Sequence, residues 1–404
     1  MLALGRSIMG APAQTAGAIE GRMRRIERSI GAFFWNGARV SLTRPAQARQ
    51  FVRTLRWQAA AARTRGEWQK RGVRVPPIVI FSITHRCNLD CVGCYDHVLH
   101  GVAVDDVPAA ATAGRDPAPT IAAPGKELSA AKLESIVAEA VGIGVSFFVI
   151  AGGEPFMRPE ILDIAGRFPR VVFLVFTNGL LLDEAMVARL KQRKNVICLL
   201  SLEGDAAETD RRRGRGTYER LVGAMARLRK ERLFFGCSVT LTSENLSTAL
   251  GDGYIRELTE AGCRLILFAE YTPVDGTTKG WELSEEERGR VPIRVAALRR
   301  RFSAVFVAVP WDEGQVGGCL SAGRGFVHIN ASGGVEPCPF APYSDVSLTD
   351  SSLVDALRSP FLTRLRTMPE LSGSAGGGCS LWINREQVEK VLADASGPPR
   401  PFRR

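Results

Sequence analysis

Three cysteines lie close together at Cys87, Cys91 and Cys94, with the spacing CxxxCxxC. They follow an apolar run, 78–83, that is typical of a buried strand. Three thiolates on one loop can bind three irons of a four-iron four-sulfur cluster, which leaves the fourth iron open. A substrate or cofactor can coordinate an open iron, whereas a cluster held by four cysteines only transfers electrons. The spacing therefore predicts a cluster that takes part in chemistry.

Zinc is the alternative for such a set of cysteines. Structural zinc sites use four ligands, usually in paired spacings, and no second pair follows nearby. CxxxCxxC followed by the aromatic residue Tyr95 resembles the signature of the radical S-adenosylmethionine (SAM) superfamily. The resemblance covers roughly residues 76–275 and implies that Tyr95 lies in the cofactor-binding region.

Two further segments match that family in chain order. Gly152, Gly153 and Glu154 follow the second apolar run and resemble the family's GGE segment, which implies that they bind the methionine amino group of SAM. Ser201 and Glu203 resemble the family's SxDG segment, in which the carboxylate holds the ribose hydroxyls. Glu203 stands where the family has Asp, so the assignment of that role depends on a longer side chain.

Two more cofactor-binding residues are implied by the same resemblance. Asn178, in Thr-Asn-Gly, matches a strand-end element, and Arg213, in an RGxGxF-like segment, would pair with the SAM carboxylate. A solvated run of arginines is the alternative for Arg213. The implied reaction is one-electron reduction of SAM, which yields a 5′-deoxyadenosyl radical that abstracts hydrogen from substrate. The implied electron donor is a ferredoxin or flavodoxin.

A second set of cysteines lies near the C-terminus at Cys319, Cys338 and Cys379. The spacing of the first two around Gly333 resembles the opening of SPASM and twitch domains, which implies a second four-iron four-sulfur cluster. The dense cysteine cluster of a full SPASM domain is absent from the sequence, so a shortened twitch-like module is expected. The alternative is that these cysteines are ordinary thiols or bind zinc.

Other polar and sulfur-containing residues carry weaker signals. The three cysteines in apolar runs, Cys198, Cys237 and Cys263, are expected to be buried core residues. Five residues lie in segments that could line the cavity, but none is assigned as a catalytic base: Glu270, Tyr271, Asp312, His328 and Glu336.

Alternating strand-like and helix-like segments must position these residues. Strands are expected at 78–83, 145–150, 171–176, 196–202, 235–241, 264–270 and before residue 309, and helices near 129–141, 159–167, 183–191, 217–230 and 253–261. This α/β pattern predicts parallel βα units, and the resemblance implies a partial (β/α)6 barrel of the radical SAM type over residues 76–309. Residues 101–126 are expected to be a flexible loop, and residues 310–404 a small iron-sulfur module and tail.

Residues 1–75 are expected to form a basic helical arm, with a turn at Asn36-Gly37 and a second helix after Pro45. The arm holds 15 Lys or Arg and 3 Asp or Glu, which gives it a net charge of 15 − 3 = +12. The arm therefore accounts for the whole net charge of the chain, which is +11. Because the rest of the chain is nearly neutral, no nucleic-acid partner is expected. The apolar face of the first helix, with Ile26 and Phe33, could lie in an anionic membrane surface or pack on the barrel.

The leading function is a radical SAM oxidoreductase or maturase whose substrate is a lipid or quinone, a peptide, or a small metabolite. The competing function is a non-catalytic iron-sulfur protein that relays electrons or binds a partner, which would have no use for the SAM-binding segments. No export signal or spanning segment is evident, so the expected compartment is the cytoplasm, either free or at the inner face of the membrane.

Overall fold

The computed structural model describes residues 16–42, 44–101, 103–104, 125–368, 371 and 379–396. Most of the expected loop at 101–126 lies outside these residues. A nine-stranded sheet dominates the fold, in the spatial order β11-β10-β1-β4-β5-β6-β7-β8-β9. The strands are β1 (Ile78–Ser82), β4 (Phe147–Ala151), β5 (Val172–Thr177), β6 (Val196–Leu202), β7 (Gly236–Leu241), β8 (Leu265–Glu270), β9 (Val305–Val309), β10 (Phe326–Ile329) and β11 (Val335–Glu336).

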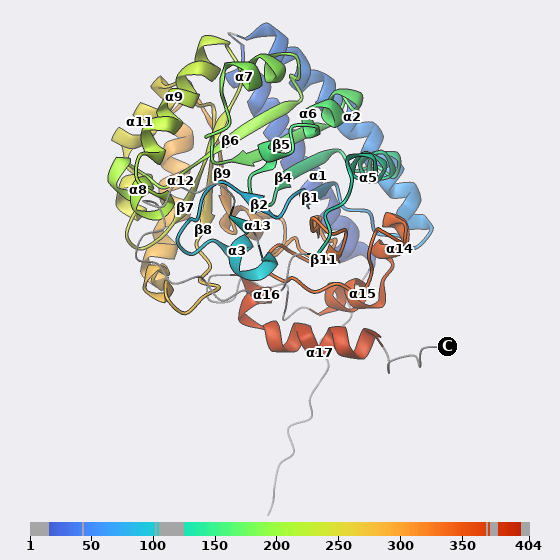
Figure 1. Ribbon diagram of the computed structural model, residues 1–404. Helices are drawn as coiled ribbons and strands as arrows, with labels where there is room; N and C mark the ends of the chain where they lie inside the picture. The colour runs from blue at the N-terminus through green and yellow to red at the C-terminus, as the bar shows by residue number, and fades with distance from the viewer. Residues whose placement is uncertain are drawn as a thin grey trace, which may run out of the picture.

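The sheet is parallel except at one edge, where β11 pairs antiparallel with β10. Six consecutive strands, β1 and β4 to β8, are neighbours in chain order, as in a partial barrel built from βα units (Figure 1). The predicted α/β fold class is therefore confirmed. The sheet gains three strands beyond those six, β9 at one edge and β10 and β11 at the other.

Helices cover one face of the sheet because alternate strand residues point to it. These helices are α5 (Ala130–Gly142), α6 (Ile161–Arg167), α7 (Glu184–Lys191), α9 (Thr217–Lys230), α11 (Asp252–Glu260) and α12 (Glu285–Arg301). A capping box between Ser284 and Glu287 begins α12. Cys198, Cys237 and Cys263 are buried in this core, which agrees with their predicted role.

The two N-terminal helices, α1 (Ala16–Val40) and α2 (Pro45–Lys70), pack on the opposite face of the sheet. Phe34 of α1 is fully buried and lies 5.9 Å from Phe147 of β4 between ring centroids. The predicted turn at Asn36-Gly37 is wrong, because α1 continues through it. Gly37 instead lets the ring of Phe51 in α2 approach, since a Cβ there would lie 3.1 Å from that ring.

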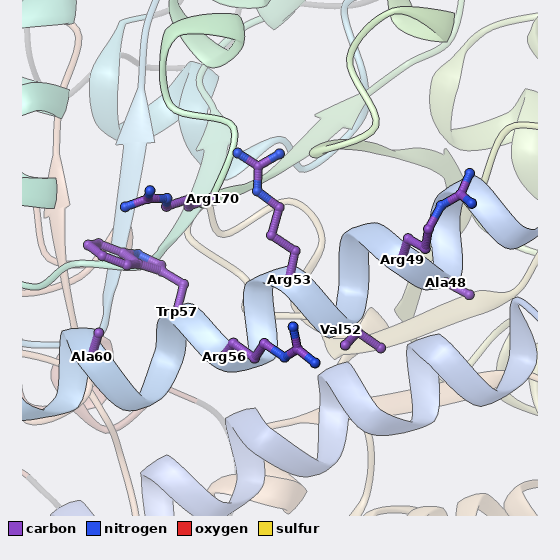
Figure 2. Close-up of a pocket in the computed structure, with 8 residues that line it drawn as sticks. All are labelled: Ala48, Arg49, Val52, Arg53, Arg56, Trp57, Ala60 and Arg170. Carbon is purple, nitrogen blue, oxygen red and sulfur yellow. The ribbon is translucent and has the colours of Figure 1, made fainter.

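Packing of α1 on the barrel also decides how its apolar face is used. Ile26 is 2% exposed, and Phe33 packs against the same cluster as Phe34. The apolar face therefore contacts the sheet, as the second alternative expected. The outer face of α2 remains open and forms a shallow groove of about 750 Å³ (Figure 2). Its lining is Ala48, Arg49, Val52, Arg53, Arg56, Trp57, Ala60 and Arg170.

Shorter elements complete the barrel and the C-terminal segment. β10 pairs with β1 directly, Ile80 opposite His328, so this segment shares the barrel's sheet. The remaining elements are β2 (Arg86–Cys87), α3 (Tyr95–His100), β3 (Ala103–Val104), η1 (Pro155–Met157), α8 (Ala206–Arg213), α10 (Leu246–Ala249), η2 (Lys279–Trp281), α13 (Trp311–Gln315), α14 (Leu353–Leu357), α15 (Pro360–Thr367), α16 (Ser380–Ile383) and α17 (Arg385–Ser396). Within the described ranges, no helix has the length and apolar character that crossing a bilayer requires.

Candidate functional site

The loop between β1 and α3 carries Cys87, Cys91 and Cys94 at the carboxyl end of the parallel strands. All three are free thiols, and none lies on the open surface. Burial raises the pKa of Cys94 to about 12, and the neighbouring Cys91 adds to that shift. Burial and Cys91 also raise the pKa of Cys87. Three close thiols that are costly to ionise on their own fit a positively charged metal centre, which binds them as thiolates.

The spread of these sulfurs favours a cluster over one ion. Four thiolates around a zinc ion at 2.3 Å would lie about 3.8 Å apart. Among the described residues, a group of His, Cys, Asp and Glu ligand atoms within 4.8 Å of one another occurs only at His100, His328 and Glu336. The sulfurs of each cysteine set are therefore more widely spread than the ligands of one zinc ion. A larger centre is the better fit to both sets.

The glycines after β4 hold this loop by backbone contacts. The amide of Gly153 donates to the Thr84 carbonyl at 3.0 Å, and the amide of Glu154 donates to the Arg86 carbonyl at 2.8 Å. A Cβ at Gly152 would lie 2.6 Å from the Thr84 carbonyl oxygen, and one at Gly153 would overlap that of Arg86. The two strand ends can approach this closely only because both residues are glycine.

Glu154 links the end of β4 to the end of β5 from a position that is 1% exposed. Its carboxylate accepts hydrogen bonds from the Thr177 hydroxyl at 2.8 Å, the Asn178 amide at 2.8 Å and the Phe156 amide at 3.1 Å. Burial raises its pKa to about 7, against the opposing effect of these donors. The Asn178 side chain donates to the Asn88 side chain at 2.7 Å and lies 4.0 Å from Cys87 Sγ.

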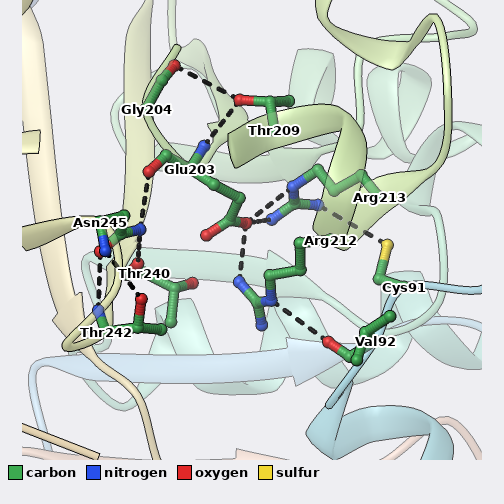
Figure 3. Close-up of polar contacts among 10 residues, drawn as sticks. All are labelled: Cys91, Val92, Glu203, Gly204, Thr209, Arg212, Arg213, Thr240, Thr242 and Asn245. Carbon is green, nitrogen blue, oxygen red and sulfur yellow. Dashed lines mark hydrogen bonds and ion pairs between the residues drawn. The ribbon is translucent and has the colours of Figure 1, made fainter. Parts of the chain in front are cut away.

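Glu203 and Arg213 form an ion pair beside the cysteine loop (Figure 3). Arg213 Nε lies 2.8 Å from Glu203 Oε1, and Arg213 Nη1 lies 3.9 Å from Cys91 Sγ. Arg212 Nη1 donates to the same carboxylate oxygen at 2.7 Å. Glu203 Oε2 is buried and has no hydrogen-bond partner among the described residues. Glu203 and Arg213, for which separate roles were expected, thus form one charged cluster with Arg212.

Ser201 and Tyr95 are the two other residues expected at the site. Ser201 is half-buried near the end of β6, opposite Ser238 of β7. The Tyr95 ring packs on Phe340, with ring centroids 4.7 Å apart. Tyr95 therefore contacts the C-terminal segment at Phe340, which lies two residues after Cys338.

Sequence reasoning missed the residues that support the Glu203 cluster. Arg212 Nε donates to the Val92 carbonyl at 3.3 Å, so it reaches the cysteine loop as well as Glu203. Asn245 Nδ2 donates to the Glu203 carbonyl at 2.6 Å, and the Thr209 hydroxyl accepts from the Glu203 amide at 3.2 Å. Arg212 lay in a run of arginines, and Asn245 lies outside every matched segment. Neither position carried a signal of its own.

The second set of cysteines also comes together, around helix α13 and the β10–β11 hairpin. Cys338 and Cys379 are hydrogen-bonded, which raises the pKa of Cys338 and lowers that of Cys379. Burial raises the pKa of Cys319 to about 11, with Glu313 adding to it. Arg22 of α1 donates to the Cys319 carbonyl at 2.8 Å. These thiols also fit a metal centre, in a segment that contacts α1.

Three candidate cavity residues have partners of their own. Glu270 pairs with Arg288 at 2.5 Å, and Asp312 pairs with Arg299 at 2.6 Å. The hydroxyl of Tyr271 contacts that of Thr278, and Arg212 lies 5.6 Å from the Tyr271 ring centroid. The partners of Glu270 and Asp312 favour structural roles for both carboxylates.

Comparisons with known proteins agree with this geometry. Residues 81–268 match the radical SAM superfamily. The chain is 24% identical over 328 residues to the AdoMet-dependent heme synthase of Methanosarcina barkeri, covering 74% of this chain and 88% of that protein. It is 26% identical over 343 residues to the mycofactocin maturase of Mycobacterium ulcerans, covering 77% and 84%.

A solved structure shares the fold. SuiB of Streptococcus suis, in its crystal structure bound to the precursor peptide SuiA, superposes with a TM-score of 0.58 at 16% identity. The match covers 80% of this chain and 72% of SuiB.

Proposed function

We propose that Cys87, Cys91 and Cys94 hold the four-iron four-sulfur cluster of this SAM-cleaving radical enzyme. Its residues 81–268 belong to the radical SAM superfamily. The observation that carries this assignment is the set of three close thiols at the carboxyl end of the parallel strands. The 3.9 Å approach of the Arg213 guanidinium to Cys91 Sγ supports it, because a cation beside a thiolate stabilises the ionised form.

SAM would lie across the ends of β4, β5 and β6. Gly152 and Gly153 hold the cysteine loop close to the end of β4, and Glu154 offers a buried carboxylate to the amino group. Glu203 Oε2, which has no partner among the described residues, is available for ribose hydroxyls. Arg213 is available for the SAM carboxylate, with Asn178 and Ser201 completing the edge of the site.

When bound, the cluster would supply one electron to SAM, which would in turn supply the 5′-deoxyadenosyl radical that abstracts hydrogen from substrate. The residues of this chain bind, orient and exclude water. The Glu203 pair with Arg212 and Arg213 fixes both guanidinium groups before SAM binds, so their orientation costs little entropy at that step. The contact of Tyr95 with Phe340 joins the cluster loop to the C-terminal segment, beside which the substrate would bind.

A second cluster is proposed at Cys319, Cys338 and Cys379. Support comes from the hydrogen bond between Cys338 and Cys379 and from the proximity of Cys319 to Cys379. A one-electron donor, proposed to be a ferredoxin or flavodoxin, would reduce the protein. The name of the heme synthase suggests a tetrapyrrole substrate, and the precursor peptide bound to SuiB suggests a peptide substrate. A lipid or quinone substrate is suggested only by the arginine groove of α2.

The central assignment is tested by replacing Cys87, Cys91 and Cys94 together with Ala. Anaerobically reconstituted protein with SAM and dithionite should form 5′-deoxyadenosine, and the triple variant should form none while it keeps the iron of the C-terminal site. A matched control replaces the buried core residues Cys198, Cys237 and Cys263 with Ala, which should leave cleavage in place. Continued 5′-deoxyadenosine formation by the first variant would refute the assignment.

A further inference from the structure

A second group of potential metal ligands lies beside the cysteine loop, and neither the proposed clusters nor SAM uses it. It consists of His100, His328 and Glu336, whose ligand atoms lie within 4.8 Å of one another. All three are buried, with exposed fractions of 6%, 0% and 2%. None of them is a cysteine, so this group differs in chemistry from both cysteine sets.

The elements bring these residues together for simple geometric reasons. His328 of β10 and Glu336 of β11 are directly opposite each other in an antiparallel pair, where side chains face the same side of the sheet. His100 lies in α3 four residues after Asp96, so both point from the same face of that helix. The hairpin and the helix thus bring two imidazoles and the Glu336 carboxylate together.

Both imidazoles present the same nitrogen to this point. His328 Nε2 is hydrogen-bonded to the Ser82 hydroxyl at 2.8 Å, and His100 Nε2 to the Pro339 carbonyl at 2.9 Å. Their Nδ1 atoms face Glu336, at 2.7 Å for His328 and 4.0 Å for His100. Metal-binding histidines characteristically donate one ring nitrogen to an outer partner and present the other to the ion.

Two carboxylates, Glu336 and Asp96, are buried here, and neither has a Lys or Arg partner among the described residues. Glu336 accepts a hydrogen bond from Asn330 at 2.6 Å, and its ion-pair partners among the described residues are the two histidines. Asp96 is 3% exposed, and within the described ranges neither of its oxygens has a hydrogen-bond partner. Burying ionised carboxylates without a cation costs several kcal/mol. A divalent ion would remove that cost.

We propose that His100 Nδ1, His328 Nδ1 and Glu336 bind a divalent transition-metal ion such as zinc. Ligands at 2.0 to 2.1 Å from a tetrahedral ion lie about 3.3 Å apart. The separations of 2.7 and 4.0 Å bracket that value, so small side-chain movements suffice. The ion would join α3, and hence the cysteine loop, to the β10–β11 hairpin.

The test uses full-length protein with its iron-sulfur clusters assembled, incubated anaerobically with excess zinc chloride and then desalted. We expect about one zinc per chain. X-ray absorption at the zinc edge should show nitrogen and oxygen ligands at about 2.0 to 2.1 Å and no sulfur shell at about 2.3 Å. A sulfur shell would place the zinc on cysteines and overturn the proposal, as would less than a tenth of an equivalent of zinc.

Variants locate the ion independently of SAM cleavage. His328→Ala and Glu336→Gln should each lose the zinc, while the iron content stays at the wild-type value. His97→Ala is the matched control, because His97 lies in the same helix but faces Asp90 at 3.5 Å, and it should keep the zinc. Asn330→Ala, which only releases the Glu336 carboxylate, should weaken zinc binding about 10- to 100-fold in a chelator competition. Zinc retained by both His328→Ala and Glu336→Gln overturns the proposal.

Discussion

A side chain at Gly153 would collide with the backbone of the cysteine loop. A methyl group there would overlap the Arg86 carbonyl oxygen and lie 3.1 Å from the Cys87 amide nitrogen. Because both contacts are with backbone, the loop itself must move. Gly153 thus sets the distance between the cysteine loop and the end of β4.

We therefore expect Gly153→Ala to lower the rate of 5′-deoxyadenosine formation by about a hundredfold, since small displacements of a positioned group cost rates of that order. Circular dichroism should show an unchanged fold. Gly253→Ala is the control, because a Cβ at that helical position meets nothing within 4 Å. Equal rates for the two variants would mean that the close approach of the strands does not position the site.

At this scale the sequence predicted residue types better than contacts. The cysteines, Glu154 and Arg213 were identified because each belongs to a short motif. The pairing of Glu203 with Arg213 was not predicted, since the motif assigns them to different parts of SAM. Arg212 was missed because one arginine in a run cannot be distinguished from its neighbours without the helix direction of α8.

Among the helices, α1 and α2 are joined by a nearly buried ion pair. Arg65 is 3% exposed, its guanidinium contacts Glu27 of α1, and it also donates to the Gly144 carbonyl after α5. Burial lowers the pKa of Arg65, and Glu27 opposes that shift. The pair therefore holds three helices together through one guanidinium.

Glu27→Gln leaves that guanidinium in the interior without its counter-charge. We expect the free energy of unfolding to fall by about 1 to 3 kcal/mol, which is a melting temperature lower by several degrees. Glu67→Gln removes an equivalent contact with Lys70 at the surface and should change nothing measurable. Differential scanning fluorimetry compares them, and equal melting temperatures would contradict a structural role for the pair.

The arginine groove of α2 suggests contact with an anionic membrane. Arg53 and Arg56 lie between Val52 and Trp57 along α2 in Figure 2, an arrangement of basic and apolar groups suited to lipid headgroups. Deleting the whole arm would expose the sheet, so point variants are the better test. The double variant Arg53→Ala/Arg56→Ala should bind phosphatidylserine vesicles about 25-fold more weakly, at about 1 kcal/mol per arginine.

A control with the same loss of charge replaces Arg220 and Arg300, which are exposed on α9 and α12. It should co-sediment with vesicles as the wild type does at low salt, and all binding should weaken at high salt. If the wild type does not co-sediment, or if both double variants lose binding equally, the groove is not a membrane contact.

Long apolar or periodic elements were predicted well, and their short neighbours were not. The seven expected strands correspond to β1 and β4 to β9, because buried parallel strands are apolar throughout. β10 and β11 have four and two residues, too few for a period to be recognised. The turn predicted at Asn36-Gly37 failed because a glycine can serve helix packing as well as a turn. The cross-strand pair of His328 and Glu336 was not predicted, because β10 and β11 are too short to be recognised in the sequence.

For the whole molecule, the number of clusters is the most direct quantity to measure. Fully reconstituted wild type should approach about eight irons per chain, from two four-iron clusters. Replacing Cys319, Cys338 and Cys379 with Ala should lower that to about four, and the remaining cluster should still change its electron paramagnetic resonance spectrum when SAM is added. Wild-type protein that saturates near four irons would remove the second cluster.

The position of β10 beside β1 has a consequence for how the chain folds during synthesis. The first strand of the barrel emerges from the ribosome early, but its neighbour on one side is made only when residues 326–329 appear. Until then β1 has an open edge with unpaired backbone groups, and such edges invite wrong pairing. Arg22 likewise can donate to the Gly318 and Cys319 carbonyls only after those residues have been synthesised. Cluster loading that requires the finished site must therefore follow translation, and in vivo yield should depend on chaperones more than the stability of the folded protein suggests.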